Sequence, residues 1–181
     1  MDTFDAVLLA RMAQRDTQAL EVFYSQHARA VYSLALFMLG DQARAAELTQ
    51  EVFLLVWRSA GAYQATGSAR AWLLRLARNR AIDELRRERR RRQSEAVAAP
   101  QVIPPWPARP DAADMAAQYA VHEALRILPA EQSEALRLAF FQGLSHQEIA
   151  AHLRTPLGTI KARIRRALLT LRRHLQGDEP G

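Results

Sequence analysis

The sequence predicts an all-α protein made of two small helical domains joined by a proline-rich linker. Ala and Leu supply 34 and 24 of the 181 residues, whereas Val, Ile and Thr together supply only 21. Ala and Leu favour helices, and β-branched residues favour strands. Five of the eight prolines lie between Pro100 and Pro110, where no helix can run because proline lacks the amide donor. We therefore expect domains at 1–93 and 115–176, a linker at 94–114 and a tail at 177–181.

Four helices are expected in the first domain. Gly40 ends the second of them, and Asp41 is suited to cap the third, because a short acidic side chain accepts hydrogen bonds from free backbone amides. A loop with Gly61 and Gly67 separates the third helix from the fourth, which continues into a run of arginines. The expected spans are 4–13, 17–39, 42 to 57 or 58, and 69 onward.

The second domain has clearer boundaries. Pro129 suits a helix start, and Ser145 followed by Glu148 forms a capping box. A turn with Pro156 then precedes the last helix. We expect helices at 115–128, 129–142, 146–153 and 159–175.

Several classes of protein are excluded. The chain has no cysteine, so disulfides, zinc fingers, iron–sulfur clusters and thiol catalysis are ruled out. It has no apolar run of ~18 residues and no basic N-terminal cluster, so we expect no membrane insertion, no signal peptide and a cytoplasmic location. His146 and His152 fall on opposite helix faces, and Gly158 to Lys161 lacks phosphate-loop spacing. We expect no enzyme activity, cofactor or metal.

Basic residues gather in two blocks. Arginine accounts for 24 of the 25 basic residues, and Lys161 is the only lysine. Residues 66–93 hold ten basic and three acidic side chains, and residues 125–176 hold nine and three. Two such blocks indicate two contacts with a polyanion, although composition alone also allows two solvated arginine-rich faces.

The last helix pairs an apolar stripe with a small, basic face. The stripe consists of Ile160, Ile164, Leu168, Leu171 and Leu175. The opposite face consists of Thr159, Ala162, Arg163 and Arg166. A short capped helix, a tight turn and this helix predict a helix-turn-helix in which Arg163 and Arg166 reach guanine edges or phosphates. Lys161, Arg165, Arg172 and Arg173 are suited to flanking phosphates; a bundle helix with a solvated basic face is the alternative.

One edge of the arginine-rich helix combines an aromatic ring, an amide and guanidinium groups. On a helical wheel these residues lie within 60° of one another: Trp72, Arg75, Asn79, Arg86 and Arg90. Such an edge is typical of a surface for single-stranded or melted nucleic acid. The alternatives are a core position for Trp72 and a solvated helix end for the arginines.

Three stretches resemble conserved regions of bacterial RNA polymerase sigma factors. AELTQEVFLLVW at 46–57 resembles region 2.2, and AWLLRLARNRAIDELRR at 71–87 resembles regions 2.3 and 2.4. LPAEQ at 128–132, GLSHQEIA at 143–150 and PLGTIKAR at 156–163 resemble region 4. The order of these motifs, with no room for other regions, is similar to that of the extracytoplasmic-function (ECF) subfamily.

The resemblance implies a promoter-specificity subunit that joins core RNA polymerase, binds promoter DNA and is held inactive by an anti-sigma factor. Region 2.2 implies a polymerase contact through Glu47, Gln50 and Glu51, with Phe53 and Trp57 either at that interface or in the core. Region 4 implies −35 recognition by Thr159, Lys161, Ala162, Arg163, Arg165 and Arg166. Regions 2.3 and 2.4 imply contacts with the melted −10 strand by Tyr63, Arg70, Trp72, Arg75, Arg78, Asn79, Arg86, Arg87 and Arg90.

Two residues depart from the family pattern. Ala46 stands where an acid is common, which weakens one expected polymerase contact. Arg154 stands where a helix-turn-helix often has Gly, so a positive φ there costs about 1 kcal/mol. Two other classes of protein fit the sequence less well. A helix-turn-helix repressor needs a receiver or ligand domain, and an RNA-binding adaptor leaves the Gln50–Glu51 surface unexplained.

Overall fold

The computed structural model describes residues 2–63, 68–95, 123 and 125–176, and every regular element among them is a helix. The chain divides into two compact units, Met1–Ala108 and Arg109–Gly181. The prediction of an all-α protein with two helical domains is confirmed for these residues. The predicted tail at 177–181 and the linker from residue 96 onward lie outside them.

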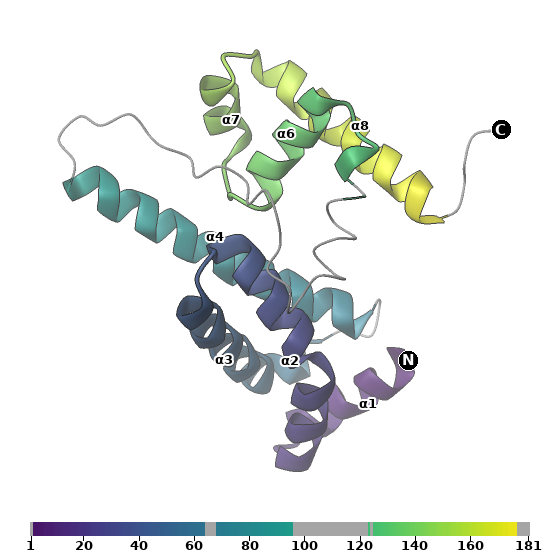
Figure 1. Cartoon of the computed structure of the whole chain (residues 1–181). Coiled ribbons are helices and arrows are strands. Elements are labelled where there is room, and N and C mark those ends of the chain that lie inside the picture. Colours follow the sequence, from purple (N-terminus) through teal and green to yellow (C-terminus); the bar gives the residue numbers. More distant parts are fainter. Residues whose placement is uncertain (1, 64–67, 96–122, 124, 177–181) are drawn as a thin grey trace. The chain divides into compact units, whose positions relative to one another are not determined.

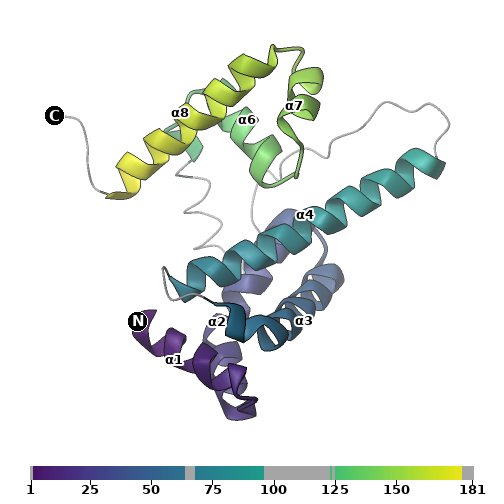
Figure 2. The same ribbon diagram turned by 180° about the vertical axis from the view of Figure 1, so that it is seen from behind.

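Within residues 2–63 and 68–95, the first unit is a bundle of four helices and one short 3₁₀ turn (Figure 1). Helix α2 packs against α3 and α4, and α1 packs against α2. From behind, the last turns of α4 extend past α2 and α3 (Figure 2). The elements are α1 (Asp2–Ala13), α2 (Thr17–Leu39), α3 (Gln42–Ser59), η1 (Ala60–Ala62) and α4 (Ala69–Glu95).

The helix ends follow from the capping residues. Asp41 caps α3 as expected, because its carboxylate accepts from the Arg44 amide at 2.8 Å. Asp16 caps α2, since its carboxylate accepts from the Gln18 and Ala19 amides. Gly40 ends α2 with a φ of 67°, a conformation that glycine adopts without steric cost.

A buried polar pair fixes α1 on α2. The Nε2 atom of His27 lies 3.1 Å from the Oδ1 atom of Asp5, and both residues are buried. The His27 ring also lies 4.5 Å, centroid to centroid, from Phe23 in the centre of the core. Burial of a polar group is costly unless it is hydrogen-bonded, so this pair favours one arrangement of the two helices.

In the part of the second unit that the structure describes, three complete helices share one core. They are α6 (Ala130–Phe140), α7 (His146–His152) and α8 (Leu157–Gln176). Helix α6 ends two residues before the predicted Gln142, and α8 begins two residues before the predicted Thr159. The predicted helix at 115–128 lies mostly outside the described residues. The buried apolar residues include Ala135, Leu136, Leu144, Ile149, Ile160, Ile164 and Ala167.

The apolar stripe of α8 is shorter than predicted. Ile160 and Ile164 are buried, but Leu168 is 41% exposed and Leu171 is only half-buried. Ala167 occupies the next inward position instead. Among the described residues, the buried positions of α8 therefore lie in its first three turns.

Candidate nucleic-acid and partner surfaces

The predicted edge of α4 exists as one exposed surface. Arg75, Asn79, Arg86 and Arg90 are all exposed on it. Trp72 is half-buried, so its indole is neither fully enclosed in the core nor fully exposed to solvent. Its ring lies 5.5 Å from the Tyr63 ring, centroid to centroid, at an interplanar angle of 58°. Two aromatic rings therefore connect the residue after η1 to the first turn of α4.

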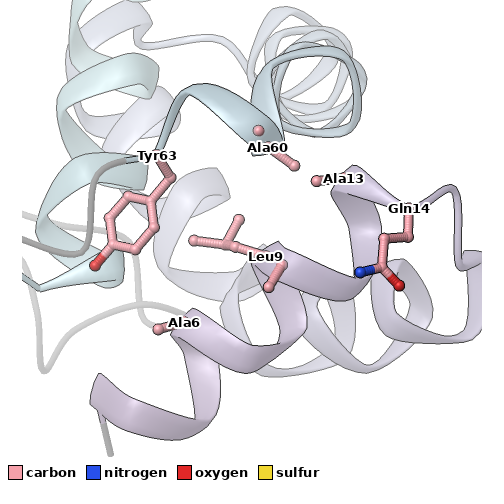
Figure 3. Close-up of a pocket in the computed structure, with 8 residues that line it drawn as sticks. Ala6, Leu9, Ala13, Gln14, Ala60 and Tyr63 are labelled. Atoms are coloured by element: carbon pink, nitrogen blue, oxygen red, sulfur yellow. The ribbon is translucent and has the colours of Figure 1, made fainter.

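Tyr63 also borders a cavity of about 350 Å³ between α1 and η1. Figure 3 shows Leu9 and Tyr63 facing this space, with Gln14 at its far end. The cavity exists because most side chains around it are small. It is lined by Ala6, Leu9, Ala10, Ala13, Gln14, Ala60, Gly61 and Tyr63.

Two arginines predicted for the −10 surface lie in different surroundings. Arg78 is half-buried, and burial, followed by the nearby Arg86 charge, lowers its pKa below the ordinary value. Arg87 borders a groove between α3 and α4 together with Glu47 and Glu51. Arg87 therefore belongs to the α3–α4 side, because it falls 100° round the helix from Arg86. Arg70 is exposed in the first turn of α4.

The α3–α4 groove, of about 180 Å³, is polar and contains ion pairs. Arg80 Nη2 lies 3.3 Å from Glu51 Oε2, and Arg44 Nε donates to Glu84 Oε1 at 2.7 Å. These two ion pairs hold α3 against α4. The sequence patterns did not identify Arg44 or Glu84 as functional residues. Their signal is present only in the contact between helices, since residues 44 and 84 are far apart in the chain. The groove is lined by Glu47, Leu48, Glu51, Arg80, Glu84 and Arg87.

The five residues predicted to bind polymerase divide into exposed and covered positions. Glu47, Gln50 and Glu51 are exposed on α3. Phe53 is only 4% exposed, and its ring lies 4.7 Å from Tyr24 and 6.3 Å from Phe23, so it is a core residue. Trp57 is half-buried, with the Arg15 guanidinium carbon 5.7 Å from its ring centroid.

The helix-turn-helix has the predicted capping box. The Glu148 amide donates to Ser145 Oγ at 3.2 Å, and the Ser145 amide donates to Glu148 Oε2 at 2.7 Å. The turn after α7 places Arg154 at a φ of 48°, the left-handed region that favours glycine. The backbone therefore adopts the turn geometry in spite of the arginine.

The outward face of α8 differs from the predicted one. Lys161, Ala162, Arg165 and Arg166 are exposed, and Thr159 is half-buried. The side chain of Arg163 is only 17% exposed, and its Nη2 atom lies 2.5 Å from Glu131 Oε2 on α6. The helical wheel predicted Arg163 on the DNA-facing side because it includes only the residues of α8 and not the packing of α6 against them. The exposed face is instead centred nearer Ala162 and Arg165.

Family models match both units. The model of sigma-70 region 2 matches residues 23–91, and the model of sigma-70 region 4 matches residues 118–171. The ECF RNA polymerase sigma factor SigK of Mycobacterium tuberculosis H37Rv is 38% identical over 174 residues, which cover 91% of this chain and 90% of that protein. The chain belongs to the ECF family of RNA polymerase sigma factors. It is therefore a transcription initiation factor and not an enzyme.

One further relative and two solved structures are also similar to this chain. SigK of Mycobacterium sp. KMS is 36% identical over 162 residues, covering 88% of this chain and 84% of that protein. The structure of Rhodobacter sphaeroides SigE in complex with the anti-sigma ChrR is 30% identical, covers 96% of this sigma factor and 99% of that chain, and has a TM-score of 0.47. Bartonella quintana RpoE, solved with the anti-sigma factor NepR, is 24% identical, covers 88% and 98% of the two chains, and has a TM-score of 0.42.

The described part of this sigma factor contains no candidate membrane-spanning helix. None of its helices is both long enough and apolar enough to cross a bilayer.

Proposed function

We propose that this sigma factor brings core RNA polymerase to promoters by reading a −35 element as duplex with α8 and holding the melted −10 strand on α4. The observation that supports this division is the different chemistry of the two basic faces. The edge of α4 contains a half-covered tryptophan, whereas the exposed start of α8 is small and basic. Aromatic rings bind unstacked bases, and a helix with small residues fits the major groove.

The −35 contact rests on the first turns of α8. Lys161, Arg165 and Arg166 are exposed there, beside the small side chain of Ala162. The capped α7 and the tight turn at Arg154 precede this helix, as in a helix-turn-helix that inserts its second helix into the major groove. Arginine donors read guanine edges, and the other cations neutralise phosphates.

The −10 contact rests on the α4 edge. Arg75, Arg86 and Arg90 supply cations along one side of the helix, and Asn79 supplies an amide that can hydrogen-bond to a base. The Tyr63–Trp72 ring pair at the start of the helix offers a surface for stacking. Arg70 adds a further exposed cation, while Arg78 and Arg87 are less favourably placed.

Docking on polymerase involves α3. Glu47 and Gln50 are exposed on it, and Glu51 already pairs with Arg80. We expect Glu47 and Gln50 to contact the polymerase directly and Glu51 to contribute through the groove between α3 and α4. We also expect an anti-sigma factor to bind the free protein, as the family membership implies.

Run-off transcription with core polymerase tests the proposal. We expect specific initiation on a subset of a genomic promoter library. Substitutions in a −35 element should act on closed-complex binding, and substitutions in a −10 element should act on strand opening. Transcription that depends on neither element, or core polymerase that is not retained by the tagged sigma factor, would contradict the proposal.

A further inference from the structure

We propose that Glu131 is a positioning residue for −35 recognition: its ion pair with Arg163 fixes how the recognition helix α8 is rotated on α6. The proposal rests on the proposed −35 role of α8. It assigns Arg163 to the interior side of the helix-turn-helix unit and leaves base reading to the exposed neighbours of Arg163.

Glu131 occupies a position where an acid is favoured. It is the second residue of α6, in the first turn, and the helix dipole stabilises negative charge there. Pro129 is the N-cap and makes no side-chain capping bond within the described structure. The Glu131 side chain is 70% exposed, so its carboxylate lies at the surface beside the first turns of α8.

The other member of the ion pair, Arg163, lies on α8. It lies in the second turn of α8, one residue before the buried Ile164 and three after the buried Ile160. Its side chain is 17% exposed, so the aliphatic part covers the edge of the core while the guanidinium meets Glu131. The ion pair thus joins α6 and α8 at the border of their shared apolar contact.

This arrangement is unsuited to base reading by Arg163. To donate to a guanine edge, the guanidinium must leave both its cover and its carboxylate partner. The charge of Arg163 is also balanced by Glu131, which weakens its attraction to phosphate. Arg165 and Arg166, by contrast, are exposed and on the outward face.

The ion pair restricts the rotation of α8 about its own axis. Arg163 and Glu131 carry opposite charges on two packed helices, so their attraction is strongest when α8 presents position 163 toward α6. Neighbouring residues on a helix differ by 100° in direction, so even a partial rotation of α8 moves Ala162, Arg165 and Arg166 together relative to the base edges. The pair therefore affects all bases that α8 reads, not one.

The first experiment removes the charge of Glu131. Holoenzyme with Glu131→Gln is titrated with promoter duplexes that carry every single substitution in the −35 element. We expect affinity for the preferred element to fall about tenfold and discrimination to weaken at several positions. Glu134→Gln is the matched control, because it removes the same charge from the same helix at an exposed position three residues away. It should leave binding unchanged.

The second experiment separates a positioning role from base reading. Arg163→Lys retains an ion pair with Glu131 and should keep the base preference, whereas a bidentate guanine contact would lose discrimination at one position. The exchange Glu131→Arg with Arg163→Glu should recover part of the affinity lost in either single variant. No exchange can restore a base contact that needs a guanidinium at position 163.

The slope of log affinity against log salt gives a third measure. One lost phosphate contact changes this slope by about 0.9, and we expect Glu131→Gln and Arg163→Lys to change it by less than that. Melting temperatures of the variants check that the unit remains folded. A loss confined to one base pair in Arg163→Lys, no rescue by the exchange, or wild-type affinity in Glu131→Gln would overturn the proposal. If wild-type holoenzyme itself shows no −35 preference, the proposed function fails instead.

Discussion

Arginine side chains with the same chemistry have different surroundings along this sigma factor. Arg15 lies over Trp57, Arg80 pairs with Glu51, and Arg163 pairs with Glu131. Arg75 is exposed on the edge of α4. A count of arginines therefore overstates the surface available to DNA, and the partner of each guanidinium decides its role.

We predict that Trp72→Ala impairs strand opening more than duplex binding. Stacking of a base on the indole is worth about 1–3 kcal/mol, and only an unstacked base can use it. Permanganate reactivity should fall while closed-complex affinity stays near wild type, and Trp72→Phe should retain most of the opening. Because Trp72 is half-buried against Tyr63, melting temperature is the control. A large drop in melting temperature without a specific loss of opening would identify Trp72 as a structural residue.

We predict that the Asp16–Arg11 pair stabilises the fold in a pH-dependent way. A hydrogen bond from Arg11, followed by one from the Ala19 amide, lowers the pKa of Asp16 below its ordinary value of 3.8. The folded form holds the proton less tightly, so the stabilisation is complete above the ordinary pKa and is lost as pH falls through the lowered one. Asp16→Asn should lower the melting temperature near neutral pH, and the gap to wild type should close in acid.

Asp41→Asn is the matched control for this experiment. Asp41 caps α3 through the Arg44 amide but has no ion pair among the described residues. The melting temperature of Asp41→Asn should differ from that of wild type by less than the melting temperature of Asp16→Asn does. A gap for Asp16→Asn that persists unchanged in acid would contradict the assignment to the ionised carboxylate.

At the scale of the helices, sequence patterns predicted the elements well because capping is local. Ser145 and Glu148 are three residues apart, and Gly40 and Asp41 are adjacent, so each signal can be read from a few residues. The rotation of α8 was less predictable, because the burial of Arg163 depends on α6, some 30 residues earlier in the chain. For the same reason the groove pairs of Arg44 and Arg80 were not anticipated.

The turn between α7 and α8 provides a prediction at this scale. Arg154 adopts a φ of 48°, which costs a residue with a Cβ about 1 kcal/mol. Arg154→Gly should therefore be more stable than Arg154→Ala by about 1 kcal/mol, less the greater freedom of glycine in the unfolded chain. Both variants lose the same charge, so their difference in chemical denaturation reports the backbone alone. If Arg154→Ala were instead more stable than Arg154→Gly by about 0.4–1 kcal/mol, the whole of the unfolded-chain effect, the turn would carry no strain.

At the scale of the whole molecule, the two units have surfaces of different character. The first unit combines a basic edge on α4 with an acidic and polar face on α3, whereas the exposed residues at the start of α8 in the second unit are basic or small. The basic edge attracts an anionic partner such as DNA, and the acidic face repels it. The two surfaces of the bundle therefore suit two different partners. The polar face on α3 therefore suits a protein partner rather than DNA.

This separation leads to a prediction about assembly with core polymerase. Glu47→Arg combined with Gln50→Ala should weaken core binding by about tenfold or more, since a reversed charge faces the complementary surface of the partner. Glu47 is preferable to Glu51 as the site of reversal. An arginine at 51 would lie beside Arg80 and disturb the contact between α3 and α4 as well.

A competition assay against labelled wild-type sigma factor measures the effect. Glu21→Arg, an equal charge reversal at an exposed position on α2, is the control and should compete like wild type. Circular dichroism should be the same for all three proteins, because none of the replaced side chains is buried. Undiminished competition by the Glu47 and Gln50 variant would mean that polymerase does not dock on this face of α3.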